Sequence, residues 1–354
     1  MRLNHSSPLP RCIDRLSSIV AQAKFAAVAL IAIALLLTAV GSVSANDDDD
    51  VPVPAEFVAA CCDACERQGD EIWLIDDRHS GCLEDGADAA ASLRFKRYNQ
   101  AGDDWQDAKA DDFFNGPGAD RPTCYWVHGD RVDSGSAISA GLTVYRRLVR
   151  KQEDAPPLRF VIWSWPASQV YRRPVPDVRL KASRTPATGF RLGYVLSRSK
   201  GDAPVWLIAY SFGSRVVTGA LTVVSGGELQ GHGLEKPAPP VAKCRAVLMA
   251  SATDYDWLEP GEPHGMALKS VDKMLLINNS CDRVLAHYRV LACGRHGAPA
   301  LGYCGVASHS ALGADAAKIR QYDACCEVGK YHRWWHYISS DSIMGQIRAT
   351  VLPK

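Results

Sequence analysis

The sequence predicts an α/β fold, in which helices cover both faces of a mostly parallel central sheet. Several apolar runs of strand length are unbroken rather than alternating, as is typical of strands that are buried on both faces. Helical patterns lie between these runs, and this alternation predicts a largely parallel sheet. The strand candidates are residues 72–75, 93–98, 125–127, 159–163, 205–210, 246–249 and 274–277.

The connections between the strands follow the same scheme with two exceptions. The first two strands are joined without a helical pattern, which is compatible with an antiparallel edge. Residues 167–186 are rich in Pro and Arg, and they are too long and too polar for an ordinary connection. We interpret this segment either as a flap over the carboxyl end of the sheet or as a solvated surface loop. The helix candidates are residues 137–151, 190–199, 214–224, 283–291 and 339–352, the last capped by Ser or Asp.

Length and composition bound the class of protein. The chain has 354 residues, of which 47% are hydrophobic, so it can build the core of one large α/β domain. Its formal net charge of +1 gives no support for a nucleic-acid-binding protein. We expect residues 57–354 to form a single domain that begins with a Cys-rich extension at 57–82.

The amino-terminal segment has the pattern of an export signal over residues 1–45. Basic residues precede an apolar run at 25–40, and a small-residue cleavage pattern, Val-Ser-Ala, follows it. The long basic region leaves the alternative that the run stays as an uncleaved membrane anchor. Residues 46–56 are acidic and contain Pro, and we interpret them as a flexible leader.

Cysteine usage agrees with export. Of the 12 cysteines, all but Cys12 follow the predicted signal, and an oxidising compartment would let most of them pair. The cluster Cys61, Cys62 and Cys65 raises the alternative of a metal site. No His or second Cys-x-x-Cys partners this cluster at a familiar spacing, so we expect no metal.

Ser211 is the candidate nucleophile. It lies between a buried-strand pattern and an amphipathic helix, and Ala209 and Gly213 supply the small neighbours that a nucleophile elbow needs. The same five-residue pattern recurs around Ser139 and Ser199. Ser139 falls inside a helical pattern and Ser199 follows a helix, so context separates Ser211 from both.

An oxyanion hole is expected upstream of the nucleophile. The strand in "CYWVHGDR" ends in His128-Gly129, and a sharp turn at Gly129 would let the backbone N–H of Asp130 or Arg131 point inward. Together with the N–H of Phe212, it would stabilise an oxyanion; we assign the pair Phe212 and Asp130.

The acid should follow a later strand, because sites in such sheets lie at the carboxyl ends of strands. Asp282 comes after a strand and a short polar turn, and it begins a helix. The competitors, Asp254 and Asp256, follow the preceding strand. Asp282 can also serve simply as a helix N-cap.

The base should be a His that follows the acid and lies near the last strand. His287 lies on the helix after Asp282, and His296 and His309 lie in a Gly-, Cys- and Ala-rich region. His332 and His336 precede the last helix, where the base is needed. We prefer His332 and retain His336 as the alternative.

The order of these motifs resembles a poorly characterised branch of the α/β-hydrolase superfamily, from Glu71 to the C-terminus. The motifs are the His-Gly strand end, Ser-Trp-Pro at 164–166, the Ala-Tyr-Ser-Phe-Gly elbow at 209–213, Asp-Arg-x-Leu at 282–285 and a His with nearby aromatics before the last helix. The resemblance implies an α/β-hydrolase fold with Ser211, Asp282 and His332 as its triad. It also implies Phe212 and Asp130 for the oxyanion.

This chain departs from the family pattern in several places. Ala209 and Tyr210 replace the usual Gly and His of the elbow, and neither position supplies chemistry. The family pattern explains neither the Cys-rich extension nor Cys281, which directly precedes the proposed acid. We hypothesise that a disulfide at Cys281 fixes that loop.

The sequence thus predicts an exported serine hydrolase that cleaves an ester, an amide or a thioester through an acyl-enzyme. The alternative is a catalytically silent protein of the same fold with a binding or envelope role. We expect no cofactor, no metal and no nucleic-acid partner. The expected partner is a small-molecule or lipid-like ester, and a membrane only if residues 25–40 remain. The aromatic residues Trp163, Trp165, Trp334 and Trp335 either contact substrate or pack in the core, and we favour the core.

Overall fold

The computed structural model describes residues 66–81, 83, 89, 91–199, 203–235, 243–291, 297–306 and 308–352. The predicted export signal, the acidic leader and most of the Cys-rich extension lie outside the described residues. Within the described part, no helix is both long enough and apolar enough to span a membrane.

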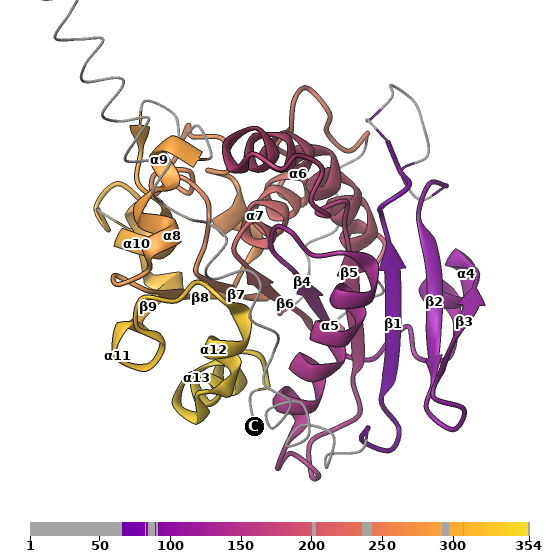
Figure 1. The fold of residues 1–354 in the computed structure, drawn as a ribbon. Helices are drawn as coiled ribbons and strands as arrows, with labels where there is room; N and C mark the ends of the chain where they lie inside the picture. Colours follow the sequence, from indigo (N-terminus) through magenta and orange to yellow (C-terminus); the bar gives the residue numbers. More distant parts are fainter. Residues whose placement is uncertain are drawn as a thin grey trace, which may run out of the picture. The chain divides into compact units, whose positions relative to one another are not determined.

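A nine-stranded sheet organises the structure (Figure 1). Only β2 runs against its neighbours, since it pairs antiparallel with β1 and with β3, and every other pairing is parallel. The predicted antiparallel edge is therefore confirmed. The strands, in spatial order, are β3 (Asp104–Ala108), β2 (Arg94–Asn99), β1 (Glu71–Asp76), β5 (Arg159–Ser164), β4 (Thr123–Val127), β6 (Val205–Tyr210), β7 (Arg245–Met249), β8 (Lys273–Asn278) and β9 (Ile319–Asp323).

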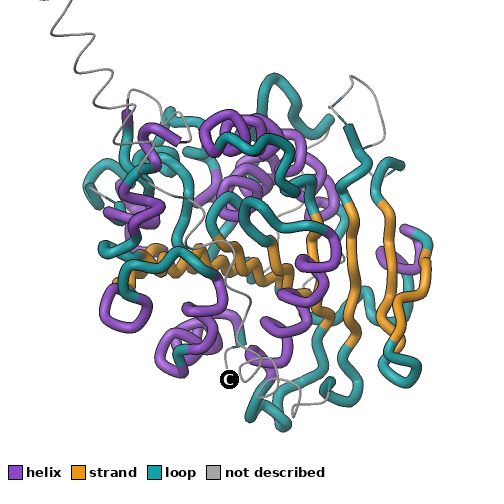
Figure 2. The backbone as a smooth tube through the Cα atoms, in the orientation of Figure 1, coloured by secondary structure: helices purple, strands orange, loops and turns teal. Residues whose placement is uncertain are grey.

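Helices cover both faces of this sheet (Figures 1 and 2). One face carries α5 (Ser134–Val149), α12 (Trp334–Ser339) and α13 (Asp341–Val351), and the other carries α6 (Pro174–Ser197) and α7 (Gly213–Val224). The short elements are α4 (Ala110–Asn115), η1 (Ala267–Ser270), α8 (Arg283–Ala286), α9 (Tyr288–Leu291), α10 (Leu301–Cys304), η3 (Gly313–Lys318) and α11 (Cys325–Val328). The predicted α/β-hydrolase fold is confirmed.

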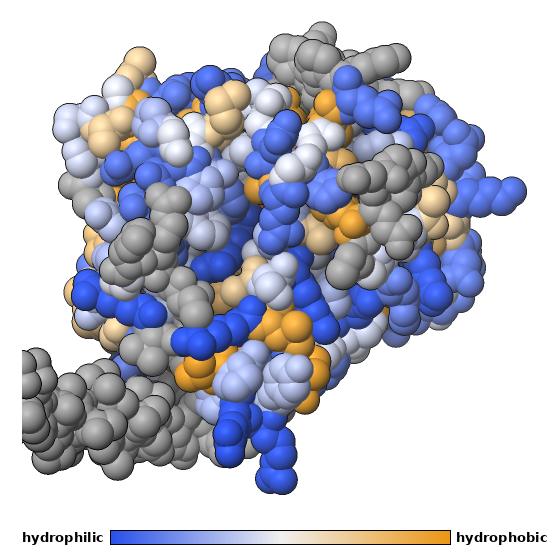
Figure 3. Space-filling model, turned by 90° about the horizontal axis from the view of Figure 1, so that it is seen from above, coloured by the Kyte–Doolittle hydropathy of each residue, from blue (hydrophilic) through white to orange (hydrophobic). Residues whose placement is uncertain are grey.

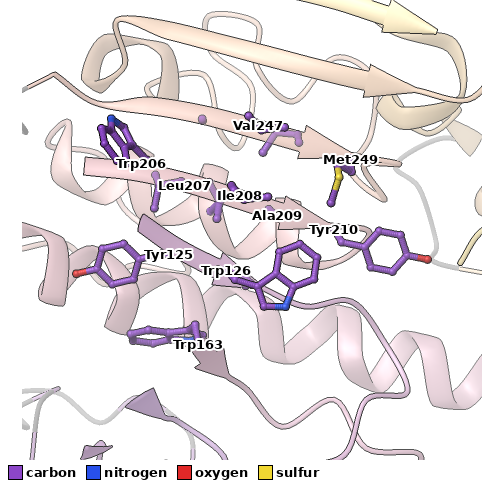
Figure 4. Close-up of a cluster of buried hydrophobic side chains, with 14 of the residues drawn as sticks. Tyr125, Trp126, Trp163, Trp206, Leu207, Ile208, Ala209, Tyr210, Val247 and Met249 are labelled. Carbon is purple, nitrogen blue, oxygen red and sulfur yellow. The ribbon is translucent and has the colours of Figure 1, made fainter. Parts of the chain in front are cut away.

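A cluster of buried hydrophobic side chains lies where β4, β5, β6 and β7 are side by side (Figure 4). Every residue of β4, β5 and β6 is buried, which explains why their sequences are unbroken apolar runs. Trp163 and Trp165 are fully buried, so the core interpretation holds for these two tryptophans. Trp334 packs against the core while remaining partly exposed.

All seven predicted strands are present, and two further strands are not among them. β3 and β9 are the two edges of the sheet, and most of their side chains are exposed or half-buried. Polar sequences such as DWQDA and IRQYD can therefore form these edge strands. They contain no apolar run, so the apolar pattern of the sequence did not predict them.

The interpretation of residues 167–186 as a flap or loop is wrong for most of the segment. Helix α6 begins at Pro174, and Pro186 lies inside it. Pro174 is tolerated because the first helical N–H groups have no partner within the helix. The helix is held by packing on α7: a Cβ added at Gly193 would lie 3.1 Å from the carbonyl oxygen of Ala220. Tertiary packing overrides the low helix propensity of Pro.

The polar character of this helix also has a structural use. Asp177 and Lys181 are both fully buried and form an ion pair one helical turn apart. Asp177 accepts hydrogen bonds from the backbone N–H groups of Val170 and Tyr171, each at 2.7 Å. The remaining loop is thereby attached to the helix that follows it. The helix predicted at 283–291 is also interrupted, since α8 ends at Ala286 and α9 begins at Tyr288.

Candidate active site

Ser211 occupies a tight turn between β6 and α7. Its φ of 53° lies in the left-handed region, which is uncommon for a residue other than Gly. Its N–H donates to the carbonyl of Met249 at 3.0 Å, so the turn is attached to the neighbouring strand β7. A Cβ added at Gly213 would lie 2.2 Å from the carbonyl oxygen of Val127. The close approach of β4 therefore requires a residue without a side chain at position 213, two residues after Ser211.

His332 lies between Ser211 and Asp282. Its Nε2 is 3.0 Å from Ser211 Oγ, and its Nδ1 is 2.6 Å from Asp282 Oδ2. In this arrangement the hydroxyl of Ser211 donates to Nε2, and the Nδ1–H group donates to the carboxylate. The imidazole ring also packs against Tyr210, with ring centroids 5.3 Å apart. The structure thus brings the three sequence-predicted side chains into one hydrogen-bonded chain.

Asp282 divides its two carboxylate oxygens between two tasks. It is the N-cap of α8, and its Oδ1 accepts the N–H groups of Val284 and Leu285 at 2.9 Å each. Its Oδ2 faces His332, and the side chain is fully buried. The N-cap role and the contact with His332 are therefore compatible, because capping fixes the plane of the carboxylate that His332 meets.

The alternative residues take other positions. Asp254 is buried beside Tyr288, whose hydroxyl donates to it at 2.6 Å, and beside Arg215. His336 lies in α12, where its ring stacks on Tyr331 and Trp335. The structure brings His332, rather than His336, into hydrogen-bond distance of Ser211.

Both proposed oxyanion donors belong to segments next to Ser211: Phe212 follows it directly, and Asp130 follows Gly129, which lies against Ser211. Phe212 is the N-cap residue of α7, so its N–H belongs to the first turn, where helical N–H groups have no partner within the helix. On the other side, a Cβ added at Gly129 would lie 2.9 Å from Ser211 Cβ. Gly129 is thus needed for close approach to Ser211. The left-handed backbone in this turn belongs instead to Arg131, with a φ of 54°.

His128 holds the turn that carries Gly129 and Asp130. Its Nδ1 is 2.9 Å from the Gly129 carbonyl, and its Nε2 accepts the backbone N–H of Trp165 at 3.2 Å. Burial, assisted by the positive charge of Arg78, lowers the pKa of His128 to about 3. The ring is therefore neutral near pH 7, and this residue positions the turn.

The side chain of Asp130 lies in a buried charged cluster next to the proposed oxyanion hole. Burial raises the pKa of its carboxyl group to about 6, and Lys181 opposes that shift. The pKa of the nearby Asp177 is lowered despite its burial, because Lys181 and two backbone N–H groups favour its charged form.

Further residues hold the Asp282 and His332 loops together, and most were absent from the sequence prediction. Asn279 is fully buried, and its Nδ2 donates to the carbonyls of Gly329 and Tyr331 at 2.9 and 3.3 Å. A disulfide joins Cys281 to Cys325, which confirms that Cys281 is paired. In the sequence, Cys281 next to Asp282 was the one signal that these two loops are linked. Asn279 gave no signal, because a buried Asn in a polar turn looks like an ordinary turn residue.

The surface in Figure 3 is mostly hydrophilic, with hydrophobic side chains in small separate patches. Among the described residues, the large hydrophobic side chains that are exposed are Val170, Tyr171 and Tyr331, at 52%, 49% and 37%. The first two residues follow β5 and the third directly precedes His332. These segments therefore lie at the carboxyl ends of the parallel strands, as Ser211 does. The described residues contain no group of three or more His, Cys, Asp or Glu side chains suited to a metal ion.

Comparisons with known proteins give distant structural likenesses. No protein-family model and no curated protein sequence matches the chain. Among solved structures, it is similar to an inhibited esterase B from Lactobacillus rhamnosis, at 14% identity and a TM-score of 0.41, over 89% of this chain and 94% of that one. It is also similar to acyl-protein thioesterase 2 from Zea mays, at 15% identity and a TM-score of 0.35, over 65% of this chain and 92% of that one. A third structure is the lin2722 gene product of Listeria innocua, at 11% identity and a TM-score of 0.36, over 66% and 95%.

Proposed function

We propose that this protein is a serine hydrolase that cleaves carboxylic esters through an acyl-enzyme on Ser211, with His332 as the base and Asp282 as the acid. The observation that carries the proposal is the chain of two hydrogen bonds through His332, of 3.0 Å to Ser211 and 2.6 Å to Asp282. A nucleophile within reach of a base, and a base oriented by a third group, is the arrangement that activates a hydroxyl.

In the proposed reaction, Ser211 Oγ attacks the ester carbonyl while His332 Nε2 takes its proton. Asp282 holds the Nδ1–H group and stabilises the charged imidazole that forms. The N–H groups of Phe212 and Asp130 would donate to the oxyanion of the tetrahedral intermediate. His332 then protonates the leaving alcohol, and a water molecule cleaves the acyl-enzyme by the same steps. None of these steps requires a cofactor.

The substrate class that we propose is a small-molecule or lipid-like ester. The support is the exposed apolar pair Val170 and Tyr171, together with Tyr331 beside the base. Such side chains favour contact with an apolar acyl or alcohol group. A panel of p-nitrophenyl esters of increasing acyl length should show kcat/KM rising with length before it levels off. Amides and thioesters would use the same steps.

We also propose that the protein is exported, on the basis of the amino-terminal sequence pattern and the exposed Cys281–Cys325 disulfide. Amino-terminal sequencing of the exported protein should give a chain that starts at Asn46. A chain that keeps residues 25–40 would instead be a membrane-anchored hydrolase.

The test of the catalytic proposal is labelling with a fluorophosphonate probe. The wild-type protein should be labelled at Ser211, and Ser211→Ala should lose both labelling and about 10⁴- to 10⁶-fold in kcat. Ser139→Ala is the matched control, because Ser139 has the same sequence pattern but lies exposed in α5. A folded wild-type protein that is not labelled would establish the catalytically silent alternative.

A further inference from the structure

The acid and the base come from two separate loops that follow neighbouring strands. Asp282 lies four residues beyond the end of β8, and His332 lies nine residues beyond the end of β9. Neither loop has a long helix or a strand at the catalytic residue, so their relative position depends on contacts between the loops. The disulfide joins the two loops at Cys281, the residue directly before the acid, and Cys325.

Hydrogen bonds link the same two loops on either side of the disulfide. Ser280 donates through its N–H and its hydroxyl to the carboxylate of Asp323, at 3.2 and 2.6 Å. On the other side, the N–H of Arg283 donates to the carbonyl of Lys330 at 3.2 Å. Asp282 lies between these contacts. The disulfide is the one covalent bond between the loops, and the buried amide of Asn279 adds two further hydrogen bonds between them.

One of the two residues of the disulfide is exposed at the surface, whereas two of the free cysteines are buried. Cys281 is exposed and Cys325 is half-buried. Cys124 and Cys244 are fully buried free thiols, and burial raises the pKa of each far above its usual range, so neither is poised to react. An exposed disulfide is the type that a soluble thiol can reduce.

We propose that the Cys281–Cys325 disulfide is a positioning crosslink that places the Asp282 loop against the His332 loop, so that turnover depends on its redox state. The inference rests on the proposed function, because it concerns the same triad. Reduction by a dithiol proceeds by thiolate attack on one sulfur, release of the other as a thiolate, and ring closure of the dithiol. The dithiol loses two electrons and two protons, and Cys281 and Cys325 each end as a thiol.

The consequence is an enzyme whose full turnover requires an oxidising compartment. With the disulfide reduced, the loops can separate by a small distance without unfolding, because α8 still holds Asp282 as its cap. A displacement of about 1 Å at a catalytic contact can cost about 100-fold in rate. We therefore expect kcat to fall about 10- to 100-fold on reduction. KM should change less than about threefold, because Val170 and Tyr171, two of the three exposed apolar side chains proposed to contact substrate, lie outside the linked loops.

The experiment compares oxidised and reduced protein in one preparation. One aliquot of oxidised wild type is labelled with the fluorophosphonate probe, and a separate, unlabelled aliquot is treated with dithiothreitol, after which the Cys281 and Cys325 thiols are identified by peptide mass. Steady-state kcat and KM, together with near- and far-ultraviolet circular dichroism, are measured before and after reduction and again after reoxidation. The expected result is a reversible loss of kcat with unchanged dichroism.

Two variants assign the effect to this disulfide. Cys281→Ser/Cys325→Ser should have the low kcat of reduced wild type and should not respond to dithiothreitol. Cys326→Ser is the matched control, because Cys326 is an exposed free cysteine next to Cys325, and it should respond as wild type does. If the double variant does not fold, reduction and reoxidation of wild type, with dichroism as the measure of folding, decide the question alone.

Three outcomes would overturn the inference. In the first, reduced wild type keeps its kcat within twofold. In the second, reduced wild type loses its folded dichroism, which would mean that the crosslink stabilises the fold. In the third, the double variant still responds to dithiothreitol. Failure of the proposed function is distinct from these outcomes, because the oxidised protein would then not be labelled at Ser211 at all.

Discussion

Ser211 and its two partners are held in place by different means. Ser211 lies between β6 and α7, in which every residue is buried, and its turn is attached to β7 by a backbone hydrogen bond. Asp282 lies instead at the start of the four-residue helix α8, and His332 lies in the loop between α11 and α12, where many side chains are partly exposed. One half of the site is built from the core, and the other half is built from turns.

The comparison shows which interactions fix the positions of the side chains in each half of the site. On the nucleophile side, close packing determines the position: Gly129 and Gly213 have space only for hydrogen, because Ser211 and Val127 lie against them. On the acid and base side, side chains replace packing: the cap of Asp282, the amide of Asn279 and the disulfide each hold one point of a loop. We therefore expect substitutions on the first side to affect folding and activity together, and substitutions on the second side to affect mainly activity.

The largest effect is expected for the base. His332→Ala removes both hydrogen bonds of the imidazole, so kcat should fall by about 10⁴- to 10⁶-fold. The free energy of unfolding should change by less than about 1 kcal/mol, because the ring is not deep in the core. His336→Ala is the matched control one helical turn away, and its kcat should remain within about threefold of wild type. The measurements are steady-state ester hydrolysis and urea unfolding. Similar losses in both variants would contradict the assignment of His332.

The same contrast explains what could be predicted from the sequence. Strand β6, Ser211 and α7 follow one another along the chain, so the nucleophile is recognisable from a local pattern. The choice between His332 and His336 stayed open because both precede the last helix and both have aromatic neighbours. The ring that meets Asp282 is determined by the loop path, which depends on Asn279 and on a disulfide between residues 44 positions apart. Such long-range contacts leave no local signal.

A second prediction tests whether packing determines the nucleophile turn. In Gly213→Ala, the new Cβ would lie 2.2 Å from the carbonyl oxygen of Val127, so either α7 or β4 must shift. We expect the free energy of unfolding to fall by about 3 kcal/mol, with loss of probe labelling at Ser211. Gly345→Ala is the matched control: Gly345 lies in α13 with nothing within 4 Å of an added Cβ, and Ala there should stabilise the helix by about 1 kcal/mol. Urea unfolding measures both, and a Gly213→Ala protein as stable as wild type would contradict packing as the cause.

The smallest effect concerns the pH dependence of stability, and it arises from two buried histidines on the nucleophile side. His128 holds the turn before Asp130, and His264 lies against Thr218 of α7, with Nδ1 2.7 Å from the hydroxyl. Burial lowers the pKa of each ring to about 3. Between pH 6.5 and about 3, the unfolded chain therefore binds two protons that the folded protein does not. The stabilisation is fully present above pH 6.5 and is lost as the pH falls, by about 1.4 kcal/mol per pH unit for each ring.

The difference between wild type and a variant isolates this effect. Asp77 and Asp130, whose carboxyl pKa values burial raises to about 6, act in the opposite direction, so the slope of wild type alone is a sum of both trends. In His264→Gln, one ring no longer takes part, and the loss of unfolding free energy between pH 6 and pH 5 should be smaller than in wild type by about 1.4 kcal/mol. Urea unfolding at the two pH values measures this difference. Equal losses in both proteins would mean that His264 takes up its proton in the folded state. Water would then reach the ring beneath α7, and packing would not exclude it from the nucleophile half of the site.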